Sequence, residues 1–288
     1  MKASSSIIFL VVCTLAFTLP SVAAEVPDAK PTVLVSILPQ KYFVNRLAGE
    51  SVQAEVMIPP GVSVEHFEPT MKQMQLAARA KLYFTIGHSR FPFEKTWLAK
   101  FGESKQLSLI NCSLGLDLLE DDPHIWVAPR EVRQIVMTIS KALEELLPEQ
   151  QSKIAERRLV LLQEIDALHV RLEKQLNPLR EHVFIIYHPE LGYFAREFGL
   201  VQRSIEQEGK DVGAHELAKL IEEAKSLGIS QILAQPQANL NSARTVAQAI
   251  DGVVVLIDPL AYDWLKNTEQ IGNILANVLA YHGHPTSN

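Results

Sequence analysis

Four short segments of the chain present side chains of the kinds that bind divalent metal ions. Three segments centre on a histidine and the fourth on an aspartate, and these residues are His66, His124, His188 and Asp258. Imidazole nitrogen and carboxylate oxygen suit zinc and its neighbours, and four such groups complete a tetrahedral shell. The residue types therefore predict a metal site, provided that the fold brings together positions that lie far apart in the sequence.

Each of the four segments also contains a proline close to the candidate ligand. These prolines are Pro69, Pro123, Pro189 and Pro259. Because the proline ring fixes the backbone φ angle, it stiffens a loop and sets the direction of the chain. A single histidine beside a strand is more often hydrogen-bonded than metal-bound. Four stiffened loops that each carry a metal-type side chain, however, favour one shared site.

The remaining histidines are weaker candidates. Five fall in a long helical pattern, near expected element ends, or in a terminal tail that we expect to be solvated: His169, His182, His215, His282 and His284. His88 follows Gly87 directly after an apolar run, so its role is left open at this point.

Short apolar runs alternate with amphipathic segments along the chain, which is the pattern of an α/β fold. We predict strands at Val33–Ile37, Gln53–Met57, Leu82–Ile86, Val183–Tyr187, Gln231–Ala234 and Val253–Ile257. Helices are expected at Lys41–Ala48, Thr70–Ala80, Phe93–Phe101, Leu191–Phe198, Glu216–Leu227, Ser242–Ile250 and Trp264–Tyr281. His188 and Asp258 would each follow a strand, and the carboxyl ends of strands form the rim where α/β sheets bind ligands.

One segment between the two halves has a different character. From Glu149 to Leu176 it contains neither glycine nor proline, and its apolar residues recur at helical spacing. Pro148 stands at the start, where a helix tolerates proline, and Asn177-Pro178 ends the pattern. A single helix of this length would be roughly 42 Å long and could run along two lobes. A helical hairpin with an unrecognised turn is the alternative.

Taken together, the motifs follow the order found in one known family. The segments are Val35-Ser36-Ile37-Leu38-Pro39, Pro60-Gly61 with His66 and Glu68-Pro69-Thr70, Asp122-Pro123-His124-Ile125-Trp126, Tyr187-His188 with Tyr193-Phe194 and Phe198-Gly199-Leu200, and Asp258-Pro259-Leu260. The chain resembles the metal-binding extracellular solute-binding proteins of zinc and manganese ABC transporters over nearly its whole mature length.

The resemblance implies two α/β lobes joined by one long helix, with the metal in the cleft between the lobes. On this basis we expect an N-terminal lobe at 25–148, the connecting helix at 149–178 and a C-terminal lobe at 179–288. The resemblance also implies a partner, the membrane permease of an ABC transporter, and a binding role without catalysis.

The same resemblance assigns the ligands. It implies that His66, His124 and His188 bind the ion, that Asp258 completes or caps the site, and that Glu65 is a reserve carboxylate. This shell is rich in nitrogen and therefore favours Zn²⁺, with Mn²⁺ or Fe²⁺ as the alternatives. The chain departs from many zinc-specific members because only Glu120-Asp121-Asp122 stands where they carry a long histidine- and acid-rich loop.

The first 24 residues have the layout of a secretory signal peptide. Lys2 supplies a basic start, Ile7–Leu19 is an uncharged apolar run, and small residues precede a cleavage site that we predict after Ala24. The run is too short to cross a bilayer stably, which takes roughly 20 apolar residues. An N-terminal membrane anchor is the alternative. We therefore expect an exported protein that is periplasmic or otherwise extracytoplasmic.

The composition of the chain argues against several other classes of protein. Hydrophobic residues make up 47% of the chain, which argues against disorder. A formal net charge of −6 without a basic stretch argues against nucleic-acid binding. Cys13 would leave with the signal peptide, so Cys112 has no partner for an internal disulfide, and we expect it to be a small buried residue. A monomer is expected.

Two other functions use the same kinds of residue. A secreted zinc hydrolase also needs histidine ligands, but no His-Glu-x-x-His motif occurs, and Glu65 is the only obvious carboxylate near a ligand that could act as general base. A metal-dependent surface adhesin is compatible with the fold, because a fold does not fix a function. Metal capture for transport is the interpretation that we favour.

Overall fold

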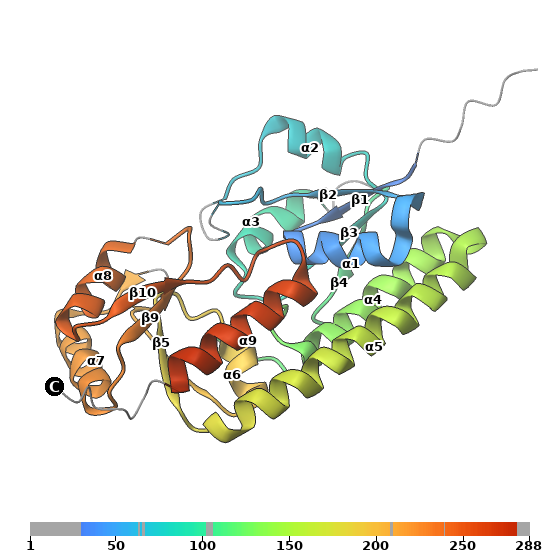
Figure 1. Cartoon of the computed structure of the whole chain (residues 1–288). Helices are drawn as coiled ribbons and strands as arrows, with labels where there is room; N and C mark the ends of the chain where they lie inside the picture. The colour runs from blue at the N-terminus through green and yellow to red at the C-terminus, as the bar shows by residue number, and fades with distance from the viewer. Residues whose placement is uncertain are drawn as a thin grey trace, which may run out of the picture.

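The structure is a computed structural model that describes residues 30–62, 64, 67–101, 106–207, 210–238 and 240–280. The expected signal peptide, Glu65, His66 and the terminal histidines lie outside the described residues. Figure 1 shows two lobes, each built around a sheet, with a long helix running beside both. Among the described helices, none combines the length and the apolar character needed to cross a membrane.

The first lobe contains a four-stranded parallel sheet in the order β2-β1-β3-β4. Its strands are β1 (Thr32–Val35), β2 (Gln53–Val56), β3 (Leu82–Thr85) and β4 (Ser108–Asn111). Its helices are α1 (Leu38–Ala48), α2 (Met71–Ala77), α3 (Pro92–Phe101) and α4 (Pro129–Leu146), and a short 3₁₀ turn spans Gly49–Ser51. The central strand β3 is buried at every position, as expected for a parallel sheet covered on both faces.

The second lobe contains a four-stranded parallel sheet in the order β10-β9-β5-β6. Its strands are β5 (Val183–Ile186), β6 (Val201–Ser204), β9 (Gln231–Ala234) and β10 (Val253–Leu256), and a small antiparallel pair joins β7 (Glu206–Gln207) to β8 (Lys210–Asp211). Its helices are α6 (Gly192–Phe198), α7 (Ala214–Ser226), α8 (Leu240–Ala249) and α9 (Trp264–Ala280).

A continuous helix, α5 (Gln151–Leu176), connects the two lobes between 3₁₀ turns at Pro148–Gln150 and Asn177–Leu179. One stripe of α5 is buried at helical spacing: Ile154, Leu161, Ile165, Leu168, Leu172 and Leu176. This stripe packs against α1 and α4 of the first lobe and against α6 and α9 of the second. The hairpin alternative is therefore wrong. The division into lobes at residues 149–178 remains our proposal for the domain limits.

Helix α9 approaches α5 closely at one glycine. A Cβ atom on Gly272 would lie 2.2 Å from Cδ2 of Leu172, so a larger residue would force the buried Leu172 side chain to move. At its start, α9 is fixed to the first lobe because the Trp264 indole N–H donates to the Trp126 carbonyl at 2.6 Å. These contacts hold α9 of the second lobe against α5 and against the first lobe.

The sequence analysis missed the strands β4, β6, β7 and β8 and the helix α4. Strands β4 and β6 lie at the sheet edges and are largely exposed or half-buried, so they lack a continuous apolar run. Helix α4 was also missed, although Pro129 stands in its first turn and its buried face follows helical spacing. The other predicted strands and helices are present, with ends shifted by a few residues.

Candidate metal site

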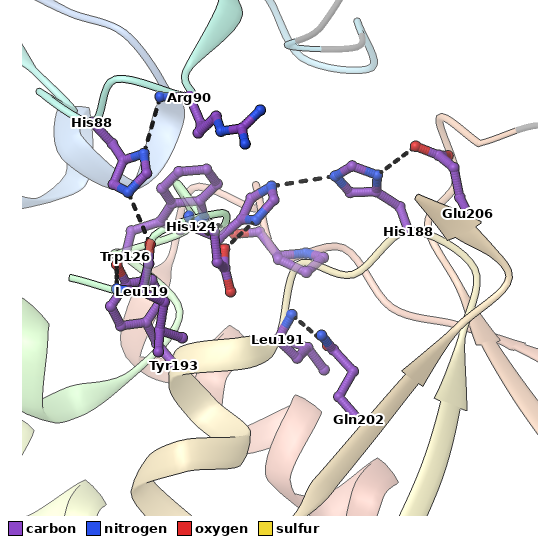
Figure 2. A network of polar contacts seen from close by, with 12 residues as sticks. His88, Arg90, Leu119, His124, Trp126, His188, Leu191, Tyr193, Gln202 and Glu206 are labelled. Carbon is purple, nitrogen blue, oxygen red and sulfur yellow. Dashed lines mark hydrogen bonds and ion pairs between the residues drawn. The ribbon is translucent and has the colours of Figure 1, made fainter. Parts of the chain in front are cut away.

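His124 and His188 meet where the two lobes face each other. His124 lies in the loop between β4 and α4, and His188 lies just after β5. Their Nε2 atoms are 3.3 Å apart and the two rings stand almost perpendicular, at 84° (Figure 2). Because His124 is 3% exposed, its ring is held inside the protein and not on a mobile surface. The structure thus brings together two of the histidines that the sequence singled out.

The other ring nitrogen of each histidine contacts a carboxylate. Nδ1 of His124 lies 2.7 Å from Oδ1 of Asp122, and Nδ1 of His188 lies 2.9 Å from Oε1 of Glu206. Each Nδ1 therefore carries the proton and donates it, which leaves a lone pair on each Nε2. Two lone pairs that face each other at 3.3 Å repel unless a cation or a proton lies between them.

The spacing of these nitrogens matches what zinc requires. A Zn–N bond of about 2.0–2.1 Å in tetrahedral geometry places two nitrogen ligands about 3.3–3.4 Å apart. The Nε2 atoms of His124 and His188 are 3.3 Å apart. One ion can therefore bind both imidazoles without a change in their separation.

Residues at three strand ends of the second sheet contribute to the same rim. His188, Gln235 and Asp258 follow β5, β9 and β10, which run parallel and therefore end on one edge. The Gln235 side chain fixes the His188 backbone from both sides: its Nε2 donates to the His188 carbonyl at 3.0 Å and its Oε1 accepts the His188 N–H at 3.3 Å. Sequence analysis missed Gln235, although its position directly after a predicted strand was a usable signal.

Asp258 lies near the two histidines without joining them in ligand geometry. Its Oδ1 accepts hydrogen bonds from Gln237 Nε2 at 3.3 Å and from the Leu260 N–H at 3.2 Å. Together with Pro59 and Pro60 of the first lobe it lines a small cavity of about 30 Å³. Among the described residues, no group of at least three histidine, cysteine, aspartate or glutamate side chains has a metal-binding arrangement.

A carboxyl group that the sequence analysis did not single out lies beside the site. Glu190 is 5% exposed, and its Oε1 has no hydrogen-bond partner within the described part of the chain. Burial raises the pKa of Glu190, while His124, His188 and a hydrogen bond from Gln235 act to lower it. The negative charge of the Asp258 carboxylate also raises the pKa of Glu190. In the sequence, the position of Glu190 two residues after His188 was the only sign that it belongs to the site.

Two further residues shape the loop of His124. A Cβ atom on Gly192 would lie 2.2 Å from Oδ2 of Asp122, so glycine is required here to leave room for the carboxylate. The Trp126 ring contacts the His124 ring edge-on, with 5.1 Å between the two ring centroids. The indole N–H of Trp126 donates to the Pro259 carbonyl at 3.1 Å. Trp126 therefore connects the His124 loop to the loop that carries Asp258.

The other histidines and the cysteine have different surroundings. His88 is buried, its Nε2 donates to the Leu119 carbonyl at 3.0 Å and its Nδ1 accepts the Arg90 N–H at 3.1 Å (Figure 2). Because both ring nitrogens are engaged by backbone groups, His88 is a structural residue. His169 pairs with Glu197 at 2.6 Å on the side of α5. Cys112 is free and fully buried, as predicted, and burial raises the pKa of its thiol well above the ordinary value.

Two parallel α/β sheets carried by one long helix, with imidazoles from both lobes meeting between them, define the solute-binding proteins of metal ABC transporters. The chain belongs to the ZnuA family, described as zinc-uptake complex component A, periplasmic, whose profile matches residues 33–278. Members of this family are substrate-binding proteins of transporters and not enzymes.

Individual relatives agree with this assignment. The high-affinity zinc uptake system protein ZnuA of Bacillus subtilis is 24% identical over 275 residues, covering 86% of this chain and 83% of the relative. A zinc-bound deletion variant of ZnuA superposes with a TM-score of 0.82 at 32% identity, covering 89% of this chain and all of that one. The laminin-binding protein of Streptococcus agalactiae, an adhesin with metal-transporting activity, shares the fold at TM-score 0.79 and 20% identity, over 86% of this chain and 99% of that one.

Proposed function

We propose that this protein captures Zn²⁺ outside the cytoplasm and delivers it to the membrane permease of an ABC transporter. The observation that carries the proposal is the pair of Nε2 atoms, on His124 and His188, that face each other at 3.3 Å. Each imidazole is oriented by a carboxylate on its Nδ1, an arrangement that occurs around metal-binding histidines and raises their basicity. Capture would occur in the mature, exported monomer, with the signal peptide cleaved after Ala24.

The proposed ligands are His66, His124 and His188, with Asp258 as the fourth group and Glu65 as the reserve. Pro59, Pro60 and Gly61, which precede His66 by a few residues in the sequence, line a cavity together with Asp258, which supports placing His66 and Asp258 at one site. Both hydrogen bonds that the Asp258 side chain accepts, from Gln237 and from the Leu260 N–H, are made by Oδ1, so Oδ2 is the oxygen that would bind the ion.

The charge around the site favours a cation. Asp122, Glu206, Glu190 and Asp258 all carry carboxyl groups close to the two histidines. Among the described residues that line the pocket beside His188, there is no lysine or arginine. Because buried carboxylates are costly without a counter-charge, a divalent ion would stabilise this arrangement.

Zinc is the metal that we propose, with Mn²⁺ and Fe²⁺ as the alternatives. Three imidazoles and one carboxylate make a nitrogen-rich shell, whereas manganese prefers more oxygen ligands. The zinc-named relative and the zinc-bound structure support the same choice. Elemental analysis of protein purified from its own extracytoplasmic compartment tests it, followed by competition at equal free metal concentration. Displacement of zinc by manganese would overturn the choice of metal.

A second candidate function is metal-dependent surface adhesion. It is favoured by the likeness in fold to a laminin-binding protein that is also a metal transporter. The two functions are compatible on one chain. Binding of the zinc-loaded protein to immobilised laminin, compared with the metal-free protein, tests adhesion without bearing on zinc capture.

A further inference from the structure

Glu190 stands out because it is a buried carboxyl group with an unused oxygen. It lies in the loop that carries His188, and its Oε1 has no hydrogen-bond partner within the described residues. Glu190 lines a pocket of about 70 Å³ together with His188 and Glu206. An unpaired carboxylate oxygen at 5% exposure is unfavourable by itself, so a positively charged partner is to be expected.

The neighbouring carboxylates are already engaged. Asp122 and Glu206 each accept the N–H of an imidazole, and Asp258 accepts two hydrogen bonds. The second oxygen of Asp122 also lacks a partner in the described part of the chain, but it faces Gly192 at the start of α6. Among the described residues that line the pocket beside His188, Glu190 is therefore the one whose carboxyl group has a buried oxygen without a hydrogen-bond partner.

The described residues that line the pocket with Glu190 include no lysine or arginine. The charged groups that act most strongly on it are His124, His188 and Asp258, and the Gln235 amide donates a hydrogen bond to it. The Nδ1 atoms of both imidazoles already contact Asp122 and Glu206, so an ion at their Nε2 atoms would be the partner that the unpaired Glu190 oxygen needs.

We propose that Glu190 is an oxygen ligand of the cation that His124 and His188 bind. The inference rests on the proposed function, because it assigns a residue to the same site. In the structure Glu190 does not form a three-ligand group with the histidines, so its side chain must turn toward the ion on binding. A second carboxylate would add a hard donor to the shell and narrow the preference for zinc over manganese.

The test uses the Glu190→Gln variant, which keeps the shape of the side chain and removes its charge. Glu131→Gln is the matched control, because Glu131 is also buried with an unpartnered oxygen but pairs with Arg196 away from the metal site. Zinc affinity is measured by competition with a chromophoric chelator, and the visible absorption of the Co²⁺-loaded protein reports the ligand set directly. Circular dichroism confirms that each variant is folded.

We expect Glu190→Gln to weaken zinc binding by tenfold or more and to change the Co²⁺ spectrum, while Glu131→Gln matches the parent. The loss of manganese affinity should exceed the loss of zinc affinity. Parent-like affinity and an unchanged Co²⁺ spectrum in folded Glu190→Gln would overturn the inference. If that variant does not fold, Glu190→Asp carries the test: a shorter carboxylate must alter the spectrum, and an unaltered spectrum overturns the inference.

Failure of the proposed function is distinguishable from failure of this inference. If His124→Ala and His188→Ala bind zinc as the parent does, the site itself is misassigned. If those two variants lose zinc and Glu190→Gln does not, the site stands and only the role of Glu190 is wrong.

Discussion

The Nε2 atoms of His124 and His188 face each other across 3.3 Å, although one histidine belongs to the first lobe and the other to the second. A metal ion held by both would therefore also join the lobes. The carboxylates on the two Nδ1 atoms come from Asp122 and Glu206, so each lobe orients its own imidazole. Metal binding would therefore depend on how the two lobes are placed relative to each other.

The first prediction concerns the carboxylate that orients His124. Asp122→Asn should weaken zinc binding by about 10- to 100-fold, because the amide no longer fixes the tautomer or raises the basicity of the imidazole. Isothermal titration in the presence of a competing chelator measures the change. Asp121→Asn is the matched control, since Asp121 is adjacent but exposed and pairs with Arg90. Equal affinity in the Asp122 and Asp121 variants would contradict the role of Asp122.

The second prediction concerns the space beneath that carboxylate. Gly192→Ala introduces a Cβ atom 2.2 Å from Oδ2 of Asp122 and must displace it. We expect weaker zinc binding together with a loss of roughly 1–3 kcal/mol in the free energy of unfolding. Chemical denaturation and zinc competition on the same variant check both effects.

Gly213→Ala is the control for this substitution. The nearest atom to a Cβ at Gly213 is the end of the exposed Glu216 side chain, 2.8 Å away, which can move aside. A Gly192→Ala protein with the stability and zinc affinity of the control would show that the close contact is not needed.

The third prediction concerns motion. Because α5 runs unbroken from Gln151 to Leu176 and packs against both lobes, it should resist a wide hinge closure. Metal-free and zinc-loaded protein should therefore differ by small loop and lobe shifts near the ligands. Small-angle X-ray scattering of the two forms tests this, and a large compaction on adding zinc would be incompatible with a rigid α5.

The fourth prediction concerns a carboxyl group buried in the first lobe. Burial raises the pKa of Glu94 from 4.5 to about 7, although Ser36 Oγ and the N–H groups of Ile86 and Gly87 donate to it. The folded state then holds this proton more tightly than the unfolded chain. Stability should fall as the pH rises from about 4.5 to about 7, by a contribution on the order of 3 kcal/mol.

Urea denaturation of the metal-free protein between pH 4.5 and pH 8 measures this dependence. Glu94→Gln should flatten it, because the amide cannot ionise, whatever the absolute stability of the variant. Glu50→Gln is the control, since the Glu50 side chain is exposed. A Glu94→Gln curve parallel to the parent curve would refute the assignment.

The sequence predicted the arrangement of helices and strands better than the residues that support the metal site. Apolar spacing was enough to find α5, and the proline-flanked histidines pointed to the loops that meet. Strand β4 escaped because three of its four positions are exposed, so its sequence lacks the apolar pattern of a buried strand. Short edge strands are stabilised by their neighbours and not by their own composition.

The supporting residues of the site could not be found from local pattern. Glu206 reaches His188 from the small strand β7, and Gln235 reaches it from the end of β9. Both contacts join residues far apart in sequence and depend on how the sheet is ordered, which spacing alone does not give. Glu190 becomes noticeable only when its burial and its unpartnered oxygen are known.

The most direct test of the central claim is the zinc affinity of His124→Ala, measured by chelator competition beside the parent and His169→Ala. His169 is the control because it pairs with Glu197 on the side of α5. If His124 and His188 bind one ion, His124→Ala loses tenfold or more in affinity, about 1.4 kcal/mol at least, while His169→Ala matches the parent. A His124→Ala protein that binds zinc as tightly as the parent would contradict the account.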